Sequence, residues 1–345
     1  MQTELLSATG TPAERQRAVA RAVELLHEGA AIGLPTETVY GLAADATNPT
    51  AVAQIFSAKE RPFFDPLIVH LPDRSWVERL TMPAPRNAEL LTRLLDRFWP
   101  GPLTVLLPRQ TSAVPDLVTA GSPLVALRQS AHPVFREVIE TFGRPLAAPS
   151  ANRFGRISPT RGEHVVAELG GRIPLVLDAG QTAHGLESTI IVLDASVGIL
   201  ILRHGPVTAE QLADFTPVQT TAGVVEERAA APGQTTGHYA PRTPLRLLLD
   251  ANDLQEFSAQ KRLGWLGFRD DRRPENWARF ALARSLSANG DLHEAAVNFF
   301  SALRQLDEAG LDCILAEPVP ELGLGRAIME RLRRAAAGSG GTAAP

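Results

Sequence analysis

Cysteine, lysine and tyrosine are scarce in this sequence. Its 345 residues include one cysteine, two tyrosines and two lysines, although 34 residues are lysine or arginine. A single cysteine excludes an intramolecular disulfide, and Cys313 lies in the apolar run 311–315, which predicts a buried strand position. A chain without disulfides suits a reducing compartment, so we expect a cytoplasmic location.

Long hydrophobic runs are also absent. No stretch of about 18 apolar residues occurs, and residues 1–10 lack a basic stretch followed by an apolar core. We therefore expect neither a membrane span nor an export signal. The formal net charge of −4 gives no overall attraction to nucleic acid, so we expect at most a weak tRNA contact through a local basic patch.

Several standard catalytic motifs are missing. Neither Lys59 nor Lys261 follows a glycine as a phosphate-binding P-loop requires, and no HExxH, CxxC, GxSxG or strand-following GxGxxG motif occurs. These absences argue against the usual ATPase, zinc, serine hydrolase and dinucleotide-binding classes. We expect no metal site made from protein side chains alone.

The apolar pattern alternates between helical and strand periods. A capping box, Thr11 with Glu14, precedes apolar residues at helical spacing and predicts a helix from Pro12 to about Gly29. Short apolar runs predict strands, and amphipathic stretches between them predict helices. This alternation predicts an α/β fold with a twisted mixed sheet and covering helices, and close spacing favours antiparallel pairing of the last strands. The predicted strands are 30–34, 39–43, 66–71, 103–107, 124–128, 175–177, 188–193 and 199–203, with another near residue 146.

The length of the chain suggests about two domains. From 216 to 243 the apolar periodicity disappears and Thr, Ala, Gly, Pro and Glu dominate, which is typical of a linker. Predicted strands at 245–249, 263–267 and 311–316 and a helix at 292–309 then indicate a smaller, Rossmann-like α/β unit. We therefore expect domains at 1–215 and 244–335 and a disordered tail at 336–345.

Polar and charged residues follow or open several predicted strands. Each has an ordinary structural explanation, such as a turn, a helix cap or a core histidine. Ligands bind preferentially at strand ends in open α/β sheets, so the recurrence of such residues favours a binding crevice. The segments are 35–42 (PTETVYGL), 59–62 (KERP), His70, Arg128, 147–152 (AAPSAN), 158–160 (SPT), 187–191 (ESTII) and 201–206 (ILRHGP).

These segments, taken in order, closely resemble the YrdC-like threonylcarbamoyl-AMP synthases, and in particular their longer, two-domain, Sua-type branch. The resemblance extends from about residue 20 to 245. It also includes DPLIVH after KERP, FWPGPLTVLL, ALR followed by AHP, and HYAPRTP near the end of the predicted linker.

The resemblance implies synthesis of L-threonylcarbamoyladenylate from L-threonine, bicarbonate and ATP, with release of pyrophosphate and Mg²⁺ bound with the ATP. A separate tRNA threonylcarbamoyl-transferase complex would use the product on an adenosine next to the anticodon. Lys59 and Arg61 would be the catalytic cations. The implied threonine-binding residues are Thr38, His70, Arg128 and Ser188. The implied ATP-binding residues are Lys59, Arg61, Asp65, Leu124, Ala148, Ser150, Ser158, Arg203 and Tyr239.

Asp65 and Tyr239 differ in chemistry or position from the other implied ATP-binding residues. Asp65 stands where the family usually has Asn, and an ionised Asp can only accept hydrogen bonds or bind a cation, whereas Asn can donate. Tyr239 would reach the nucleotide from the linker, and the length and Pro/Gly content of the linker suggest that residues 225–240 act as a lid over the labile carbamate.

Two other functions remain as alternatives. A carbamoyl-adenylate-forming relative would carry zinc-finger-like and acylphosphatase-like regions, which the single cysteine disfavours. A non-catalytic RNA-binding or translation-associated protein would rely on an arginine-rich surface, which the overall acidity disfavours. Threonine-dependent release of pyrophosphate separates the synthase from both.

Overall fold

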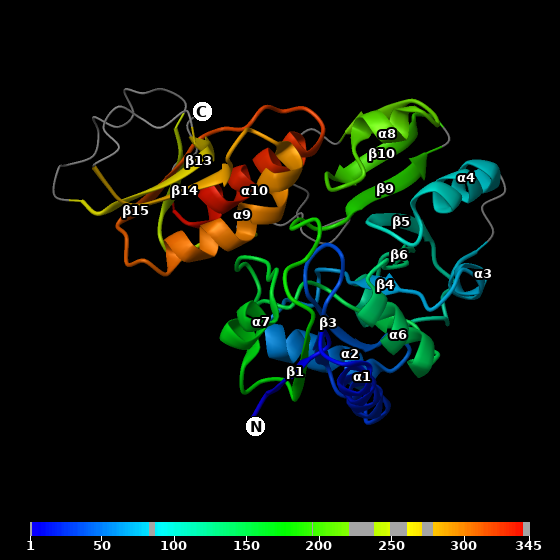
Figure 1. Cartoon of the computed structure of the whole chain (residues 1–345). Helices are drawn as coiled ribbons and strands as arrows, with labels where there is room; N and C mark the ends of the chain where they lie inside the picture. Colours follow the sequence, from blue (N-terminus) through cyan, green and yellow to red (C-terminus); the bar gives the residue numbers. More distant parts are fainter. Residues whose placement is uncertain are drawn as a thin grey trace. The chain divides into compact units, whose positions relative to one another are not determined.

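A computed structural model describes residues 2–82, 87–194, 196–220, 238–248, 261–270 and 279–340. The chain forms two compact units (Figure 1). The first comprises Met1–Phe154, Ser158–Ala183 and Glu187–Thr235. The second comprises Gly155–Ile157, His184–Leu186 and Thr236–Pro345, so two short segments that precede residue 187 in the chain belong to the second unit.

Within the described residues, the first unit contains an 11-stranded sheet in the order β1-β8-β2-β3-β7-β4-β6-β5-β9-β10-β11. Both parallel and antiparallel pairs occur, and β9 and β10 pair antiparallel, which confirms the predicted twisted mixed sheet. The strands are β1 Glu4–Ser7, β2 Ile32–Leu34, β3 Gly41–Asp45, β4 Ile68–His70, β5 Leu103–Pro108, β6 Leu124–Arg128, β7 Leu146–Ala147, β8 Leu175–Asp178, β9 Thr189–Asp194, β10 Gly198–Arg203 and β11 Val218–Thr220.

Helices cover the two faces of this sheet. The predicted capping box is present, because the Thr11 side chain accepts from Glu14 N and the Glu14 side chain accepts from Thr11 N at the start of α1. One face packs against α2 and α4, and part of the opposite face packs against α1 and α6. The helices are α1 Pro12–His27, α2 Pro49–Lys59, α3 Ser75–Leu80, α4 Ala88–Phe98, α5 Asp116–Thr119, α6 Pro133–Phe142, α7 Gly162–Leu169 and α8 Ala209–Ala213.

The face that carries α1 and α6 has a second region where neither helix packs. A separate apolar cluster lies there, formed by Ile68, Leu106, Ala126 and Ile190 of β4, β5, β6 and β9. Side chains two positions apart on a strand point to the same face. Four polar residues therefore project from the same side of the sheet as this apolar cluster and lie beside it: His70, Thr104, Arg128 and Ser188.

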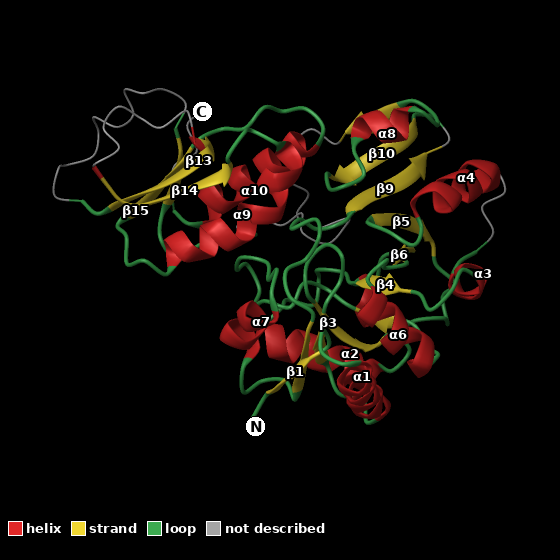
Figure 2. Ribbon diagram, viewed as in Figure 1, coloured by secondary structure: helices red, strands yellow, loops and turns green. Residues whose placement is uncertain are grey.

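The second unit contains, among its described residues, a four-stranded parallel sheet in the order β12-β15-β13-β14. Figure 2 shows α9 and α10 packed beside these strands. Cys313 is buried in β15, as the apolar run predicted. The elements are β12 Leu245–Leu247, β13 Leu263–Arg269, β14 Phe280–Ser287, α9 Leu292–Asp307, β15 Cys313–Ala316 and α10 Leu324–Gly338.

The structure moves two of the expected boundaries. β11 pairs with β10 in parallel, so the first unit continues through Thr220 and the linker does not begin at residue 216. α10 continues to Gly338 because its apolar residues, Leu332 and Ala335 among them, are buried, so the expected tail is helical over its first residues.

Most of the proposed lid, 225–237, lies outside the described residues. No helix within the described ranges is long and apolar enough to cross a membrane.

Candidate functional site

Several of the expected site residues meet at one edge of the large sheet. His70, the last residue of β4, lies beside Arg128, the last residue of β6, in parallel register. β5 runs antiparallel to β6 and begins at this edge, and β9 runs parallel to β5 and begins there with Ser188 just before it. β10 is antiparallel to β9 and ends at the same edge with Arg203.

Other expected residues lie at the opposite edge. β7 runs antiparallel to β4, so Ser150, which follows β7, lies toward the beginning of β4. The segment 35–40 starts from this second edge, because Leu34 at the end of β2 pairs there with Gly41 at the beginning of β3. Its residues Glu37 and Thr38 nevertheless hydrogen-bond to Arg128 at the first edge. The expectation of a crevice at one row of strand ends is therefore too simple, because this segment crosses the sheet face between both edges.

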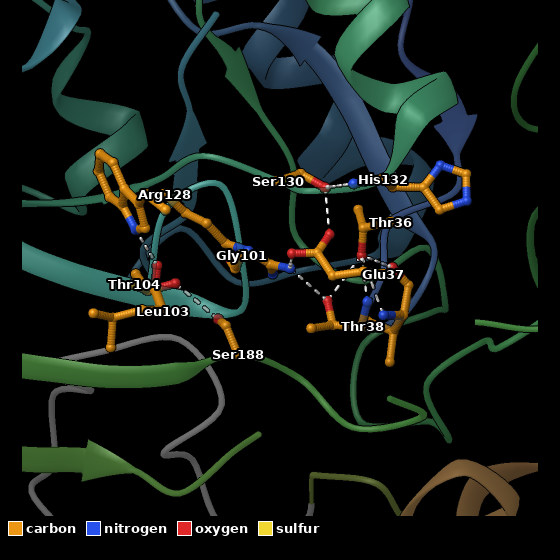
Figure 3. A network of polar contacts seen from close by, with 12 residues as sticks. Thr36, Glu37, Thr38, Gly101, Leu103, Thr104, Arg128, Ser130, His132 and Ser188 are labelled. Atoms are coloured by element: carbon orange, nitrogen blue, oxygen red, sulfur yellow. Dashed lines mark hydrogen bonds and ion pairs between the residues drawn. The ribbon is translucent and has the colours of Figure 1, made fainter. Parts of the chain in front are cut away.

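Arg128 is the centre of a polar network (Figure 3). Its guanidinium donates from Nη2 to Glu37 Oε1 at 2.7 Å and to Thr38 Oγ1 at 3.0 Å, and from Nε to Gly101 O at 3.3 Å. Arg128 is 3% exposed. Nη1 has no hydrogen-bond partner among the described residues, so two N–H groups of the guanidinium remain available to a ligand.

Glu37 is the counter-ion of Arg128. Its Oε2 accepts a short hydrogen bond from Ser130 Oγ, and Ser130 Oγ also accepts from His132 N at 3.2 Å. Burial by itself would raise the pKa of the Glu37 carboxyl, but the charge of Arg128 and the hydrogen bonds from Ser130 and Arg128 outweigh burial and lower this pKa to about 2. Glu37 is therefore ionised at neutral pH.

The lowered pKa of Glu37 predicts a loss of stability in acid. A carboxyl whose pKa is lower in the folded than in the unfolded state binds fewer protons when folded, so falling pH favours unfolding. The stabilisation should be complete above pH 4.5, the ordinary pKa of the group, and decline as the pH falls from there to about 2. It should amount to about 3 kcal/mol. Urea unfolding of the wild type and of Glu37→Gln should be measured across this pH range. The free energy of unfolding should decline less in the variant, and equal declines in the two proteins would contradict the prediction.

His70 is buried beside this network. Its ring lies 4.7 Å from the ring of Phe135 in α6, and its Nδ1 has no hydrogen-bond partner within the described residues. Burial, together with the positive charge of Arg128, lowers the pKa of His70 to about 3. The imidazole is thus neutral near pH 7, so it can accept one hydrogen bond from a ligand and donate another.

Ser188 belongs to a second group at the same edge. Its Oγ shares a hydrogen bond of 2.8 Å with Thr104 Oγ1, and Arg203 donates from Nη2 to Ser188 Oγ at 3.1 Å and to Ser188 O at 3.0 Å. A Cβ on Gly205 would lie 2.4 Å from Thr189 N, so only glycine lets the chain after Arg203 pass this close. The segment 101–104 joins the two groups, since Gly101 O accepts from Arg128 and Thr104 bonds to Ser188.

Lys59 ends α2 and is 1% exposed. Its ammonium donates to Ser150 O at 2.6 Å and to Asn152 O, and so ties the end of α2 to the segment after β7. Burial, with the positive charge of Arg61, lowers the pKa of Lys59 well below its ordinary value. An ammonium has three donors, and the third has no acceptor among the described residues.

Arg61 and Asp65 form a buried ion pair, with Nη2 of Arg61 2.8 Å from Oδ2 of Asp65. Arg61 also donates to Asp65 O at 3.1 Å and to Pro66 O at 2.7 Å, so it fixes the turn that leads into β4. Asp65 is completely buried. Its carboxylate is thus the counter-ion of Arg61, a role that the usual Asn could not fill, and it presents no accessible atom to ATP in this structure.

The other expected ATP-binding residues of the first unit differ in what they can offer. The backbone N–H groups of Leu124 and Ala148 already donate, to Ser122 Oγ at 3.1 Å and to Ile68 O at 2.9 Å. Ser158 is fully buried and donates to Glu187 Oε1 at 2.5 Å. The half-buried hydroxyl of Ser150 has no partner within the described residues and is the most available of these groups.

Tyr239 belongs to the second unit. It is 2% exposed, its ring lies 5.5 Å from the ring of Phe300, and the guanidinium of Arg331 lies over it at 5.6 Å. The next residue, Ala240, donates from its backbone to Gly155 O at 2.8 Å. The structure therefore gives Tyr239 a packing role within its own unit.

Sequence reasoning missed three members of the network: Glu37, Ser130 and Thr104. Each lies inside or beside a segment that was singled out, but none was given a role. Glu37 carried a usable signal, because a lone carboxylate between two apolar strands must be paired if it is buried. Ser130 and Thr104 carried none, since a single hydroxyl at a strand end has many structural uses.

Among the residues that the structure describes, no group of three or more His, Cys, Asp or Glu could hold a metal ion.

Comparisons with known proteins identify related sequences and a related fold. The family model Sua5_yciO_yrdC, described as Telomere recombination, matches residues 24–205. The model described as Threonylcarbamoyl-AMP synthase, C-terminal domain, matches residues 207–337. The chain is 40% identical over 328 residues to the threonylcarbamoyl-AMP synthase of Bacillus subtilis (strain 168), covering 93% of each chain. It is 37% identical over 328 residues to that of Pyrococcus abyssi, covering 91% of this chain and 92% of the relative.

A solved structure extends the similarity to the whole fold. The crystal structure of P. abyssi Sua5 complexed with L-threonine superposes with a TM-score of 0.84 at 34% sequence identity and covers 98% of each chain. The two family models together match residues 24–205 and 207–337, and the P. abyssi structure covers 98% of this chain, so the similarity runs through both units. This chain belongs to the family of the two-domain, Sua5-type threonylcarbamoyl-AMP synthases.

Proposed function

We propose that this chain is an enzyme that makes L-threonylcarbamoyladenylate from L-threonine, bicarbonate and ATP and releases pyrophosphate. Its full-length relatives are named threonylcarbamoyl-AMP synthase, and a related structure binds L-threonine. The observation that carries the proposal is the guanidinium of Arg128. Its Nε and Nη2 are fixed by protein acceptors, and its Nη1 is left for the carboxylate of an amino acid.

The surroundings of Arg128 suit the rest of threonine. Thr38 and the neutral His70 can exchange hydrogen bonds with its hydroxyl group, and Ser188 lies across the segment 101–104 from Arg128. The apolar cluster of Ile68, Leu106, Ala126 and Ile190 projects from the same face and can receive the methyl group. These contacts would hold the amine in position for reaction.

The reaction needs no nucleophile from the protein. The deprotonated threonine amine captures bicarbonate to form an N-carboxylate with loss of water. A carboxylate oxygen of this carbamate then attacks the α-phosphorus of ATP, and the bond to the bridging oxygen breaks to release pyrophosphate. The protein must align the reactants and stabilise the charge that develops on the phosphate oxygens.

The cations near the sheet face differ in their suitability for that task. Arg61 is already neutralised by Asp65 at 2.8 Å, whereas Lys59 donates only to the uncharged carbonyls of Ser150 and Asn152. A phosphate that approached Lys59 would favour the protonated ammonium and offset the effect of burial on its pKa. We therefore assign Lys59 the main electrostatic role, with Ser150 and Arg203 as further nucleotide-binding groups. Ser158 would join them only in a conformation that exposes its hydroxyl, because it is fully buried and donates to Glu187.

We further propose that Mg²⁺ enters bound to the phosphates of ATP, as part of the substrate. The adenylate would pass to a separate tRNA threonylcarbamoyl-transferase complex in the cytoplasm, with at most a weak tRNA contact by this chain. Asp65 would act as a direct ATP ligand only in a conformation that exposes its carboxylate. Tyr239 stays a proposed nucleotide contact from the second unit.

The experiment that tests the proposed function is pyrophosphate release by the purified protein from Mg²⁺-ATP and bicarbonate. We expect release to require L-threonine and bicarbonate and to be much slower with L-serine, which lacks the methyl group. Release that depends on carbamoyl phosphate instead would identify the carbamoyl-adenylate-forming activity. Salt-dependent tRNA binding without any consumption of ATP would identify a non-catalytic RNA-binding protein.

A further inference from the structure

Glu37 is a buried carboxylate with unused capacity to accept hydrogen bonds. It is 6% exposed, and its two oxygens accept one hydrogen bond each, from Arg128 Nη2 and from Ser130 Oγ. The N–H of Glu37 itself also contributes a hydrogen bond that lowers the pKa of the carboxyl. An ionised carboxylate offers about four acceptor positions, so about one remains. Both side-chain donors come from β6 or the residues just after it, since Arg128 ends β6 and Ser130 follows two residues later (Figure 3).

The position of Glu37 relative to Arg128 suits an α-amino acid. Nη2 of Arg128 holds Glu37, and Nη1 is left for the ligand, so a bound carboxylate would lie next to Glu37 on the same guanidinium. The ammonium group of an α-amino acid is attached to the carbon that bears its carboxylate. A ligand anchored through Nη1 therefore carries its ammonium group within reach of Glu37.

The charge balance of the site favours the same ligand. Arg128 and Glu37 neutralise one another, and the nearby imidazoles add no charge, because burial lowers the pKa values of both His70 and His132. A zwitterion adds no net charge to such a site. A simple carboxylate would add an unbalanced negative charge beside Glu37, which is costly where water is excluded.

We propose that Glu37 accepts the α-ammonium group of threonine and thereby makes the site specific for α-amino acids over the same acid without the amino group. This inference rests on the proposed function, because it takes threonine as the ligand. Glu37 and Arg128 together then recognise both charged ends of the substrate. In a later step the ammonium group gives one proton to solvent water, and the neutral amine then captures bicarbonate.

His70 is the competing acceptor for the ammonium group. Its Nδ1 has no partner among the residues described, and its ring is neutral. If His70 held the ammonium group, removing the charge of Glu37 would leave the preference for an amino acid intact. If Glu37 only positioned Arg128, removing its charge would weaken the binding of every carboxylate ligand equally.

Calorimetric titration without ATP separates these cases. The ligands are L-threonine and (R)-3-hydroxybutanoate, which has the same hydroxyl, methyl and carboxylate groups but no ammonium group. In the wild-type protein we expect the hydroxy acid to bind at least 30-fold more weakly than threonine. In Glu37→Gln we expect threonine to bind about 10- to 30-fold more weakly and the hydroxy acid to bind no more weakly than in the wild type, so the preference should largely disappear.

A preference that persists in Glu37→Gln, or an equal loss for both ligands, would overturn the proposal. Glu140→Gln, an exposed acid on α6, is the matched control and should change neither affinity. If Glu37→Gln does not fold, the wild-type comparison can still overturn the proposal, because equal affinity for both ligands would contradict it. Absence of threonine binding by the wild-type protein would instead contradict the proposed function itself.

Discussion

Arg128→Ala is expected to reduce threonine-dependent pyrophosphate release by about 100- to 1000-fold in kcat/KM. The guanidinium is the proposed anchor of the threonine carboxylate, and no other cation contacts Glu37 or Thr38 within the described residues. The change also leaves Glu37 buried without its counter-ion, so the free energy of unfolding should fall by about 3–5 kcal/mol. Urea unfolding and steady-state kinetics, measured at pH 7, check both expectations.

A second variant separates the two effects of Arg128→Ala. Combining it with Glu37→Gln removes the unpaired charge, so most of the lost stability should return while activity stays low. Arg136→Ala breaks an exposed ion pair with Glu140 and serves as the control, with an expected change below about 1 kcal/mol and full activity. Recovery of activity in the double variant would show that Arg128 acts on folding and not on threonine.

Lys59→Met should give the other large effect, a loss of at least about 100-fold in kcat for pyrophosphate release. The substitution keeps the length and packing of the side chain but removes the ammonium that faces only neutral carbonyls. Stability should change by only about 1–2 kcal/mol, because the lost hydrogen bonds are partly offset by relief from burying a charge. Single-turnover kinetics with saturating ATP measure the first effect.

The chain provides its own control for Lys59→Met. Lys261 is the only other lysine, lies in the second unit and is exposed, so Lys261→Met should leave activity unchanged. Threonine affinity in the absence of ATP should also survive Lys59→Met, since Lys59 contacts Ser150 and Asn152 and not the Arg128 network. A parallel loss of threonine binding would mean that Lys59 maintains the whole site and not the nucleotide subsite.

The sequence predicted most of the large sheet because its strands are short, apolar and separated by turn residues. The strand 124–128 was predicted to the residue, and β9 and β10 pair antiparallel as their spacing suggested. β1 was missed because it is mostly exposed and shows no apolar run. β14 was missed because its half-buried positions include Arg284 and Ser285, and this polar composition hides the strand period.

Site residues that belong to recognisable motifs could be predicted from the sequence. The contacts among them could not, because folding brings the partners together. The motif segments located Thr38, Arg128 and Ser188. In the structure Arg128 donates directly to Thr38, and the segment 101–104 connects Arg128 to Ser188. Which cations pair with a carboxylate and which donate only to carbonyls could not be predicted, because this depends on partners that lie close only after folding. Arg61 has a carboxylate four residues away along the chain, whereas the partners of Lys59 are about 90 residues distant.

The discontinuous second unit limits how this chain can be divided for protein engineering. Arg304 is 6% exposed and donates to Ile157 O, and Gly185 passes so close to α9 that a Cβ would lie 2.3 Å from Ala296 O. A fragment that began after the linker would lack both strand-free segments, and a buried guanidinium would lose a carbonyl that the first half of the chain supplies. Transplanting this unit onto another protein would therefore require three pieces of sequence, in the right spatial order, instead of one.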